Sequence, residues 1–378
     1  MKSSFLKIMA LTFALLMVFT ACAPTTQPSG DVTDATTEEP TTEATITEAA
    51  TTENATTEGP TTEAATTETE EATTLAATTE APATEEAATE EQKAEEPKVK
   101  NVLMIGNSFC YYYVEELTSM ARVDGYTLTV ANLYKSGAPI SDQYDSYKTG
   151  EKVGELFVTQ KGRRKSAGQY SFKEALEYAE TKLGEKWDVI TLQGSSRNAL
   201  LGNPEADVEA TLPYAIELYS YLKEEYSGAE LYWHQTWSYE IGYGSDKTSE
   251  IEKVTTAEKR TSMYEIKKAT SYRIAEETGV KLMPTGDAWE IARKNALIGT
   301  TLCERSNVNG GLGDYYHDGD TGGGQYLNAC VWYEVLMGKS CIGNTWRPNY
   351  ALSEEKIAIL QAAAHEAVAA VYGEDYAK

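Results

Sequence analysis

The feature that most constrains the fold of this chain is a run of four apolar residues, Val102 to Ile105, that ends at Gly106. Such a run is typical of a strand buried on both faces, as in the parallel sheets of α/β proteins. Ser108 follows two residues later, and a helical pattern begins with Val114. A serine at such a strand-to-helix turn has its hydroxyl at the carboxyl edge of the sheet, where a nucleophile and part of an oxyanion hole can be built together. Serine and asparagine are also favoured there as helix caps, so a purely structural turn is the alternative.

The first residues of the chain have the layout of an export signal. Residues 1–21 carry two lysines before an apolar core and end in small residues, and the apolar run is too short to span a bilayer. Cys22 follows directly, as in a bacterial lipobox, so we expect a lipidated Cys22 that anchors the protein at the outer face of a membrane. Plain secretion with cleavage near Ala21 is the alternative.

Residues 22–98 are predicted to be a disordered linker. Between residues 23 and 97 the chain repeats Thr-Thr-Glu with Ala and Pro, and 19 acidic residues stand against one lysine, which accounts for −18 of the formal net charge of −25. Such a segment cannot bury enough apolar surface to offset the entropy cost of ordering it. The acidity therefore belongs to the linker, and because no basic patch offsets it, the charge argues against nucleic acid as a partner.

Residues 99–378 are enough for one large α/β domain. After the first strand, the sequence predicts strands and helices that alternate. The further strands are expected at 126–132, 187–193, 229–234 and 280–283. Helices are expected at 172–183, 207–226, 256–278 and 354–371, and one more follows the Gly-rich residues 310–324 and ends at about 337. This alternation favours a parallel sheet of about five strands with helices on both faces. Ligands of such sheets bind outside the carboxyl ends of the strands.

The cysteines other than Cys22 are Cys110, Cys303, Cys330 and Cys341, and no pair has the CxxC spacing of a zinc site. A disulfide, for example between Cys303 and Cys341, and buried free thiols both remain open.

Residues that could carry chemistry fall at the carboxyl ends of the expected strands and in one late loop. Asp314 stands three residues before His317 in a Gly-rich segment, and the strand ends supply Ser108, Gly137, Gln193 and His234. A serine hydroxyl becomes a nucleophile when an imidazole takes its proton and a carboxylate orients the ring. Asp314 and His317 can supply both groups from a single loop.

Three short motifs resemble the SGNH (GDSL-type) hydrolase superfamily: Gly106-Asn-Ser-Phe109, a glycine in the loop after the second strand, and Asp314-x-x-His317. The similarity covers Val102 to about Gly338. Within it, the GNSF motif and the late Gln325-Tyr-Leu-Asn-Ala resemble a branch of uncharacterised bacterial surface proteins in which GNSF replaces GDSL. The resemblance implies a flavodoxin-like three-layer α/β/α fold and ester hydrolysis without a metal or other cofactor.

The resemblance also implies roles for single residues. Ser108 would be the nucleophile, His317 the general base and acid, and Asp314 its orienting carboxylate. The amides of Ser108 and Gly137 would form the oxyanion hole. The family's third donor is an Asn in a Gly-x-Asn-Asp block, where this chain has Gln193-Gly-Ser-Ser. Because a Gln side chain carries the same amide one methylene further out, we expect Gln193 to replace it. A polar strand end that faces water is the alternative.

The substrate is predicted from aromatic residues and from the linker. Tyrosines are frequent in the domain, and Trp237 follows the fourth strand near His234. Flat rings with a polar group suit sugar faces, although they also serve as core and rim, and we expect His234 and Trp237 to contact substrate. The sequence thus predicts a cell-surface serine esterase that removes O-acetyl groups from carbohydrate. A lipid acyl-hydrolase and a non-catalytic glycan-binding lipoprotein are the alternatives; the sugar, the acyl group and the oligomeric state stay open.

Overall fold

A computed structural model describes residues 99–244, 247–298, 323–349 and 352–378. The chain divides into two units, Met1–Glu86 and Ala87–Lys378. The first unit lies outside the described residues, as do the predicted signal segment, Cys22 and the whole of the predicted linker. Cys303, Asp314 and His317 also lie outside them.

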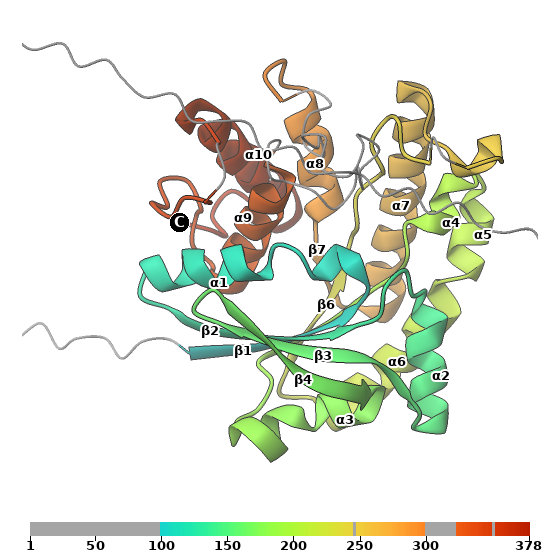
Figure 1. Cartoon of the computed structure of the whole chain (residues 1–378), viewed down its shortest axis with the longest axis vertical. Coiled ribbons are helices and arrows are strands. Elements are labelled where there is room, and N and C mark those ends of the chain that lie inside the picture. The colour runs from blue at the N-terminus through green and yellow to red at the C-terminus, as the bar shows by residue number, and fades with distance from the viewer. Residues whose placement is uncertain (1–98, 245–246, 299–322, 350–351) are drawn as a thin grey trace, which may run out of the picture. The chain divides into compact units, whose positions relative to one another are not determined.

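The described part of the second unit is built on a seven-stranded sheet in the order β4-β3-β2-β1-β5-β6-β7 (Figure 1). The strand β1 lies in the middle and pairs in parallel with β2 and β5, and β6 and β7 continue the parallel arrangement. The mostly parallel α/β sheet predicted from the sequence is therefore confirmed. The strands are β1 Val99–Gly106, β2 Thr127–Tyr134, β3 Lys152–Gln160, β4 Arg163–Ser171, β5 Val189–Gln193, β6 Glu230–His234 and β7 Lys281–Met283.

The sheet is wider than the five expected strands because an unpredicted antiparallel hairpin, β3–β4, is added to β2. Gln160 pairs with Arg163, which leaves Lys161 and Gly162 as a two-residue turn. Both residues have positive φ, 51° and 75°, as in the turn type that best fits the twist of a hairpin.

Helices cover both faces of the sheet, which confirms the predicted three-layer arrangement (Figure 1). The predicted helix at 207–226 is two helices, α5 and α6, and α2, α4 and α8 were not predicted. The helices are α1 Val114–Val123, α2 Ile140–Thr149, α3 Phe172–Leu176, α4 Arg197–Leu200, α5 Pro204–Glu209, α6 Leu212–Glu225, α7 Ala257–Thr278, α8 Thr285–Arg293, α9 Gly324–Met337 and α10 Glu354–Tyr372, with short helical turns η1 Ser108–Cys110, η2 Ala179–Leu183 and η3 Glu250–Glu252. No helix among the described residues is both long enough and apolar enough to cross a membrane.

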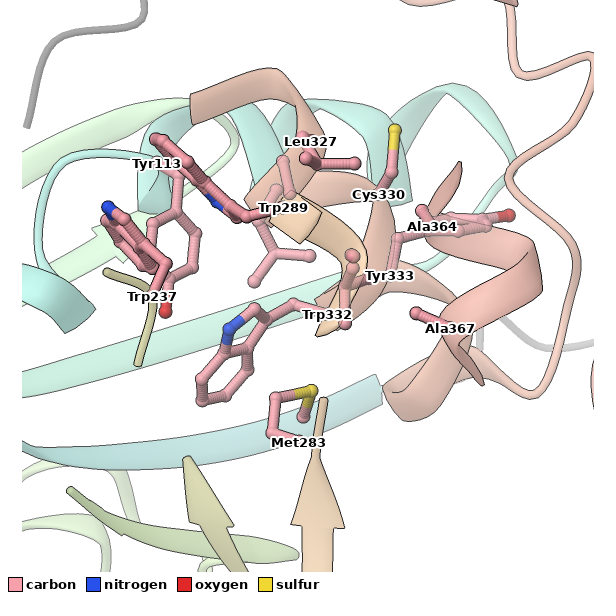
Figure 2. Close-up of a cluster of buried hydrophobic side chains, with 14 of the residues drawn as sticks. Tyr113, Trp237, Met283, Trp289, Leu327, Cys330, Trp332, Tyr333, Ala364 and Ala367 are labelled. Carbon is pink, nitrogen blue, oxygen red and sulfur yellow. The ribbon is translucent and has the colours of Figure 1, made fainter. Parts of the chain in front are cut away.

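The middle strand is buried on both faces, as its unbroken apolar run predicts. Val102 and Met104 belong to the core that includes side chains of α1, α8, α9 and α10, whereas Leu103 and Ile105 belong to the core that includes α3 and α6. The helix α9 is itself buried on nearly all sides, and Figure 2 shows Trp332 and other α9 side chains packed between their neighbours. Burial on every side is why α9 carries apolar residues all round rather than along one stripe.

The described cysteines, Cys110, Cys330 and Cys341, are buried free thiols. Cys303 lies outside the described residues, so the disulfide that the sequence left open for it stays open.

Candidate functional site

The carboxyl ends of β1, β2, β5 and β6 lie next to one another at one edge of the sheet. Gly106 pairs with Tyr134, and Gln193 pairs with His234, while β1 and β5 are themselves neighbours. The segments that follow these strands therefore meet at the same edge, which is where open α/β sheets bind ligands. This edge is the candidate site.

The turn after β1 holds Ser108 in a defined conformation. Ser108 opens the three-residue turn η1, and Asn107 caps this turn by accepting a hydrogen bond from the Phe109 amide on its Oδ1 at 3.1 Å. Across the sheet, Asn132 Nδ2 donates to the Cys110 carbonyl at 2.6 Å. The helix α1 begins only at Val114, so Ser108 lies at the start of this short turn rather than at the first turn of α1.

The loop after β2 runs beside the turn that carries Ser108. The Lys135 amide donates to the Gly106 carbonyl at 3.2 Å, and the Ala138 amide donates to the Lys135 carbonyl at 3.2 Å. Gly137 occupies the third position of the resulting β-turn with φ 64°, a conformation that favours glycine. Among the described residues, the amides of Ser108 and Gly137 have no hydrogen-bond partner. Two adjacent loops thus each offer one N–H group at this edge.

The side chain of Asn107 connects these loops to the end of β5. Its Nδ2 donates to the Ala138 carbonyl at 2.9 Å, and its Oδ1 accepts from Gln193 Nε2 at 2.6 Å as well as from the Phe109 amide. Asn107 and Gln193 are 1% and 2% exposed. One N–H of Gln193 is therefore engaged with Asn107, and the expected role of Gln193 as the third oxyanion donor stays a prediction that would use its other N–H.

His234 lies at the end of β6 behind Gln193. Its Nδ1 is 3.2 Å from Gln193 Oε1, and its Nε2 has no hydrogen-bond partner among the residues that the structure describes. Burial away from water lowers the pKa of His234 to about 3, because the charged form is not solvated there. The imidazole is therefore neutral at physiological pH, and its fully buried position leaves it on the inner side of the candidate site.

Trp237, which the sequence places beside the pocket, is packed into the core. Its ring stacks on Trp289 at 4.7 Å between centroids and meets the edge of Phe109 at 4.6 Å. Figure 2 shows Trp237 and Trp289 together with Tyr113 in this cluster. Because only 2% of Trp237 is exposed, its burial favours a packing role behind Ser108 over contact with a polymer, and the contact of Trp237 with substrate stays a prediction.

A group of more accessible aromatic rings, which we call the tyrosine cluster (Tyr111, Tyr112 and Tyr134), lies beside the same edge. Tyr111 packs on Tyr112 and Tyr134 with ring centroids 5.2 and 4.5 Å apart, and Tyr112 is 37% exposed. The Arg164 guanidinium lies over the Tyr111 ring at 3.8 Å. The run of tyrosines after Ser108 was the sequence signal for this cluster, but Tyr134 was not singled out.

The site combines a strand-end serine with two backbone amides that have no partner in the described part of the chain. Sequence comparison places the chain in a family. The sequence matches the family described as "Domain of unknown function (DUF4886)" over residues 101–367. The chain belongs to the DUF4886 family. A crystal structure of a DUF4886 family protein from Bacteroides uniformis is 25% identical, with a TM-score of 0.58 over 73% of this chain and 96% of that one.

Two other solved structures resemble this DUF4886 protein less closely. The acetyl xylan esterase AlAXEase is 13% identical, covers 62% of this chain and 99% of its own, and has a TM-score of 0.36. A GDSL-like lipase from Bacteroides thetaiotaomicron is 10% identical, covers 63% and 88%, and has a TM-score of 0.33. No match is found among curated protein sequences. The family match and the Bacteroides uniformis structure show the family and the predicted α/β fold. These two distant likenesses carry no argument, and the relationship to SGNH (GDSL-type) hydrolases is carried by the motifs named above as a prediction.

Proposed function

We propose that this DUF4886 protein is an extracytoplasmic serine esterase that removes O-acetyl groups from carbohydrate. The observation that carries the proposal is the position of Ser108 at the carboxyl end of the middle strand, with its own amide and that of Gly137 unpartnered among the described residues. Backbone N–H groups held in place before the reaction are what a developing oxyanion requires.

In the proposed reaction, the Ser108 Oγ attacks the acyl carbonyl carbon while the His317 imidazole takes the hydroxyl proton. The carbonyl oxygen becomes an oxyanion that the amides of Ser108 and Gly137 stabilise, with Gln193 as a proposed third donor. The tetrahedral intermediate then breaks its bond to the sugar oxygen, which leaves with the proton held by His317. Water attacks the acyl-serine in the same way, acetate departs, and Ser108 regains its proton. Asp314 orients the imidazole throughout.

The tyrosine cluster and the predicted anchor support the choice of substrate. Partly exposed rings that bear hydroxyl groups suit contact with sugar faces, and Tyr111, Tyr112 and Tyr134 lie next to the loop that holds Gly137. An export signal followed by Cys22 and a long acidic linker would hold the domain outside the cell, where acetylated polysaccharides occur. The proposed partners are thus an acylated carbohydrate and, through the lipid on Cys22, a membrane.

The experiment that tests the activity compares the full chain with Ser108→Ala on an acetyl-ester chromogenic substrate. We expect wild-type turnover and labelling by a fluorophosphonate probe at Ser108, and the loss of both in the variant with an unchanged melting transition. Ser119→Ala is a matched control, because Ser119 is also buried but lies on α1 and donates to the Glu115 carbonyl. Unchanged turnover in Ser108→Ala would end the proposal.

Two alternatives have their own readouts. A lipid acyl-hydrolase would prefer long-chain over acetyl esters in the same assay. A non-catalytic glycan-binding protein would show neither turnover nor probe labelling while still binding polysaccharide.

A further inference from the structure

The side chain of Asn107 sits between the two loops that carry the proposed oxyanion donors. Asn107 immediately precedes Ser108, and its hydrogen-bond partner Ala138 immediately follows Gly137. A single side-chain amide therefore links the chain next to one donor with the chain next to the other. The only other hydrogen bond between the two segments in the described part of the chain joins two backbone groups, from the Lys135 amide to the Gly106 carbonyl.

The orientation of the Asn107 amide is determined by the backbone. Its Oδ1 accepts from the Phe109 N–H, and its Nδ2 donates to the Ala138 carbonyl, so oxygen and nitrogen cannot be exchanged. Gln193 must then donate to Oδ1 through Nε2 and present its own oxygen to His234. It follows that the neutral His234 ring carries its proton on Nδ1.

The result is a buried chain of hydrogen bonds from the Ala138 carbonyl through Asn107 and Gln193 to His234. Each of the three side chains is at most 2% exposed, and in a low-dielectric interior such bonds are directional and costly to leave unmade. The chain runs across three parallel strand ends, those of β1, β5 and β6. It is placed to hold the Ser108 turn and the Gly137 loop at a fixed separation.

We propose that Asn107 is a positioning residue that sets the distance between the two backbone donors of the oxyanion hole, with Gln193 and His234 fixing its orientation. The inference rests on the proposed esterase function. It concerns a residue that does not touch the reacting atoms itself. Because the oxyanion forms only in the reaction, a misplaced donor lowers kcat more than it changes substrate binding.

The first variant is Asn107→Ala, which removes the side-chain amide and with it the bond to the Ala138 carbonyl. The Phe109 amide and Gln193 Nε2 lose their acceptor as well, so the buried chain of hydrogen bonds is broken at Asn107. We expect kcat on an acetyl ester to fall by about 10²-fold, as for one lost oxyanion donor, with KM changed by less than about 3-fold. Fluorophosphonate labelling of Ser108 should slow in parallel.

Asn107→Ser is the second variant, because serine also caps helical turns and can keep the bond from the Phe109 amide while it is too short to reach Ala138. The same selective loss of kcat is expected. Asn344→Ala is the matched control: Asn344 is a buried asparagine that donates to the Met120 carbonyl and to Asp124 Oδ2 at the C-terminal end of α1, and its variant should keep the wild-type kcat. Melting transitions of all three variants separate folding from catalysis.

A folded Asn107→Ala or Asn107→Ser protein with wild-type kcat would overturn the positioning role. So would equal losses of kcat in Asn344→Ala, or the failure of both Asn107 variants to fold, because either would assign Asn107 to stability alone. These outcomes differ from a failure of the esterase proposal, in which the wild-type protein itself shows no turnover that depends on Ser108.

Discussion

Gln193 lies so close to Gly106 that no larger residue fits at position 106. A Cβ built on Gly106 would lie 2.6 Å from Gln193 Cδ and closer still to Cγ. Glycine in the Gly-Asn-Ser-Phe stretch is therefore required by the side chain at the end of the neighbouring strand. Because Gly106 on β1 has no side chain, Gln193 can lie against β1 and reach Asn107.

We expect Gly106→Ala to destabilise the fold by about 1–3 kcal/mol, the usual cost of overpacking a tight interior. The added methyl group must push Gln193 away from Asn107, so turnover should fall as well. Urea unfolding measures the first effect and an acetyl-ester assay the second. Gly228→Ala is the control, because a Cβ there meets no heavy atom within 4 Å and the residue has no positive φ; equal unfolding free energies for the two variants would contradict the packing argument.

The buried His234 should make stability depend on pH in the acid range. Its pKa is lowered to about 3 in the folded protein, whereas an unfolded histidine titrates near pH 6.5. Between these values the unfolded state binds a proton that the folded state does not, so stability falls as the pH falls from about 6.5 toward 3, by up to about 1.4 kcal/mol per pH unit.

The measurement is urea unfolding of wild-type protein and His234→Gln at pH 7, 6 and 5. The wild-type protein should lose more free energy of unfolding over this range than the variant, since carboxylates titrate in both. Parallel pH profiles would show that His234 is charged or exposed in the folded protein.

A buried ion pair joins α5 to α7. Lys267 Nζ lies 3.4 Å from Asp207 Oδ2 and 3.3 Å from the Ser195 carbonyl, and both side chains are at most 2% exposed. Lys267→Met should cost about 3–5 kcal/mol because it leaves a buried carboxylate without a partner. The double variant Lys267→Met, Asp207→Leu should recover most of this loss, and urea unfolding of both proteins tests the difference; equal losses would contradict it.

The thiol two residues after Ser108 should not take part in the reaction. Cys110 is buried, and burial raises its pKa to about 12, so the reactive thiolate is scarce at neutral pH. We expect iodoacetamide to leave both Cys110 and the esterase activity unchanged in the native protein and to modify Cys110 after denaturation. Inactivation that follows modification of Cys110 in the folded protein would point to a cysteine nucleophile instead of Ser108.

The sequence predicted the parallel strands because each is an apolar run or an alternating β-rich segment between breaks. It did not predict the hairpin β3–β4, since Arg163, Arg164 and Lys165 make β4 look like a solvated loop. Such charges are common on edge strands, where they discourage pairing with other chains. The two-residue Lys161-Gly162 turn was the local signal that could have indicated the hairpin.

The candidate site was predicted in part. Ser108, Gly137, Gln193 and His234 were found because strand ends meet at one edge of an α/β sheet. The contact from Asn107 to Ala138 spans 31 residues and joins a side chain to a backbone carbonyl, so no local pattern reveals it. Burial of Trp237 likewise depends on a partner, Trp289, that belongs to an unpredicted helix. The roles of Asp314 and His317 stay predictions.

The direction of β1 has a consequence for any upstream attachment. The polypeptide enters the domain at Val99, whereas Ser108 follows the opposite end of the same eight-residue strand, about 26 Å away at the rise of a β-strand. A tether joined before Val99 would therefore act on the far rim of the sheet, and under the proposed function large acylated polymers would approach the Ser108 rim without passing the point of attachment.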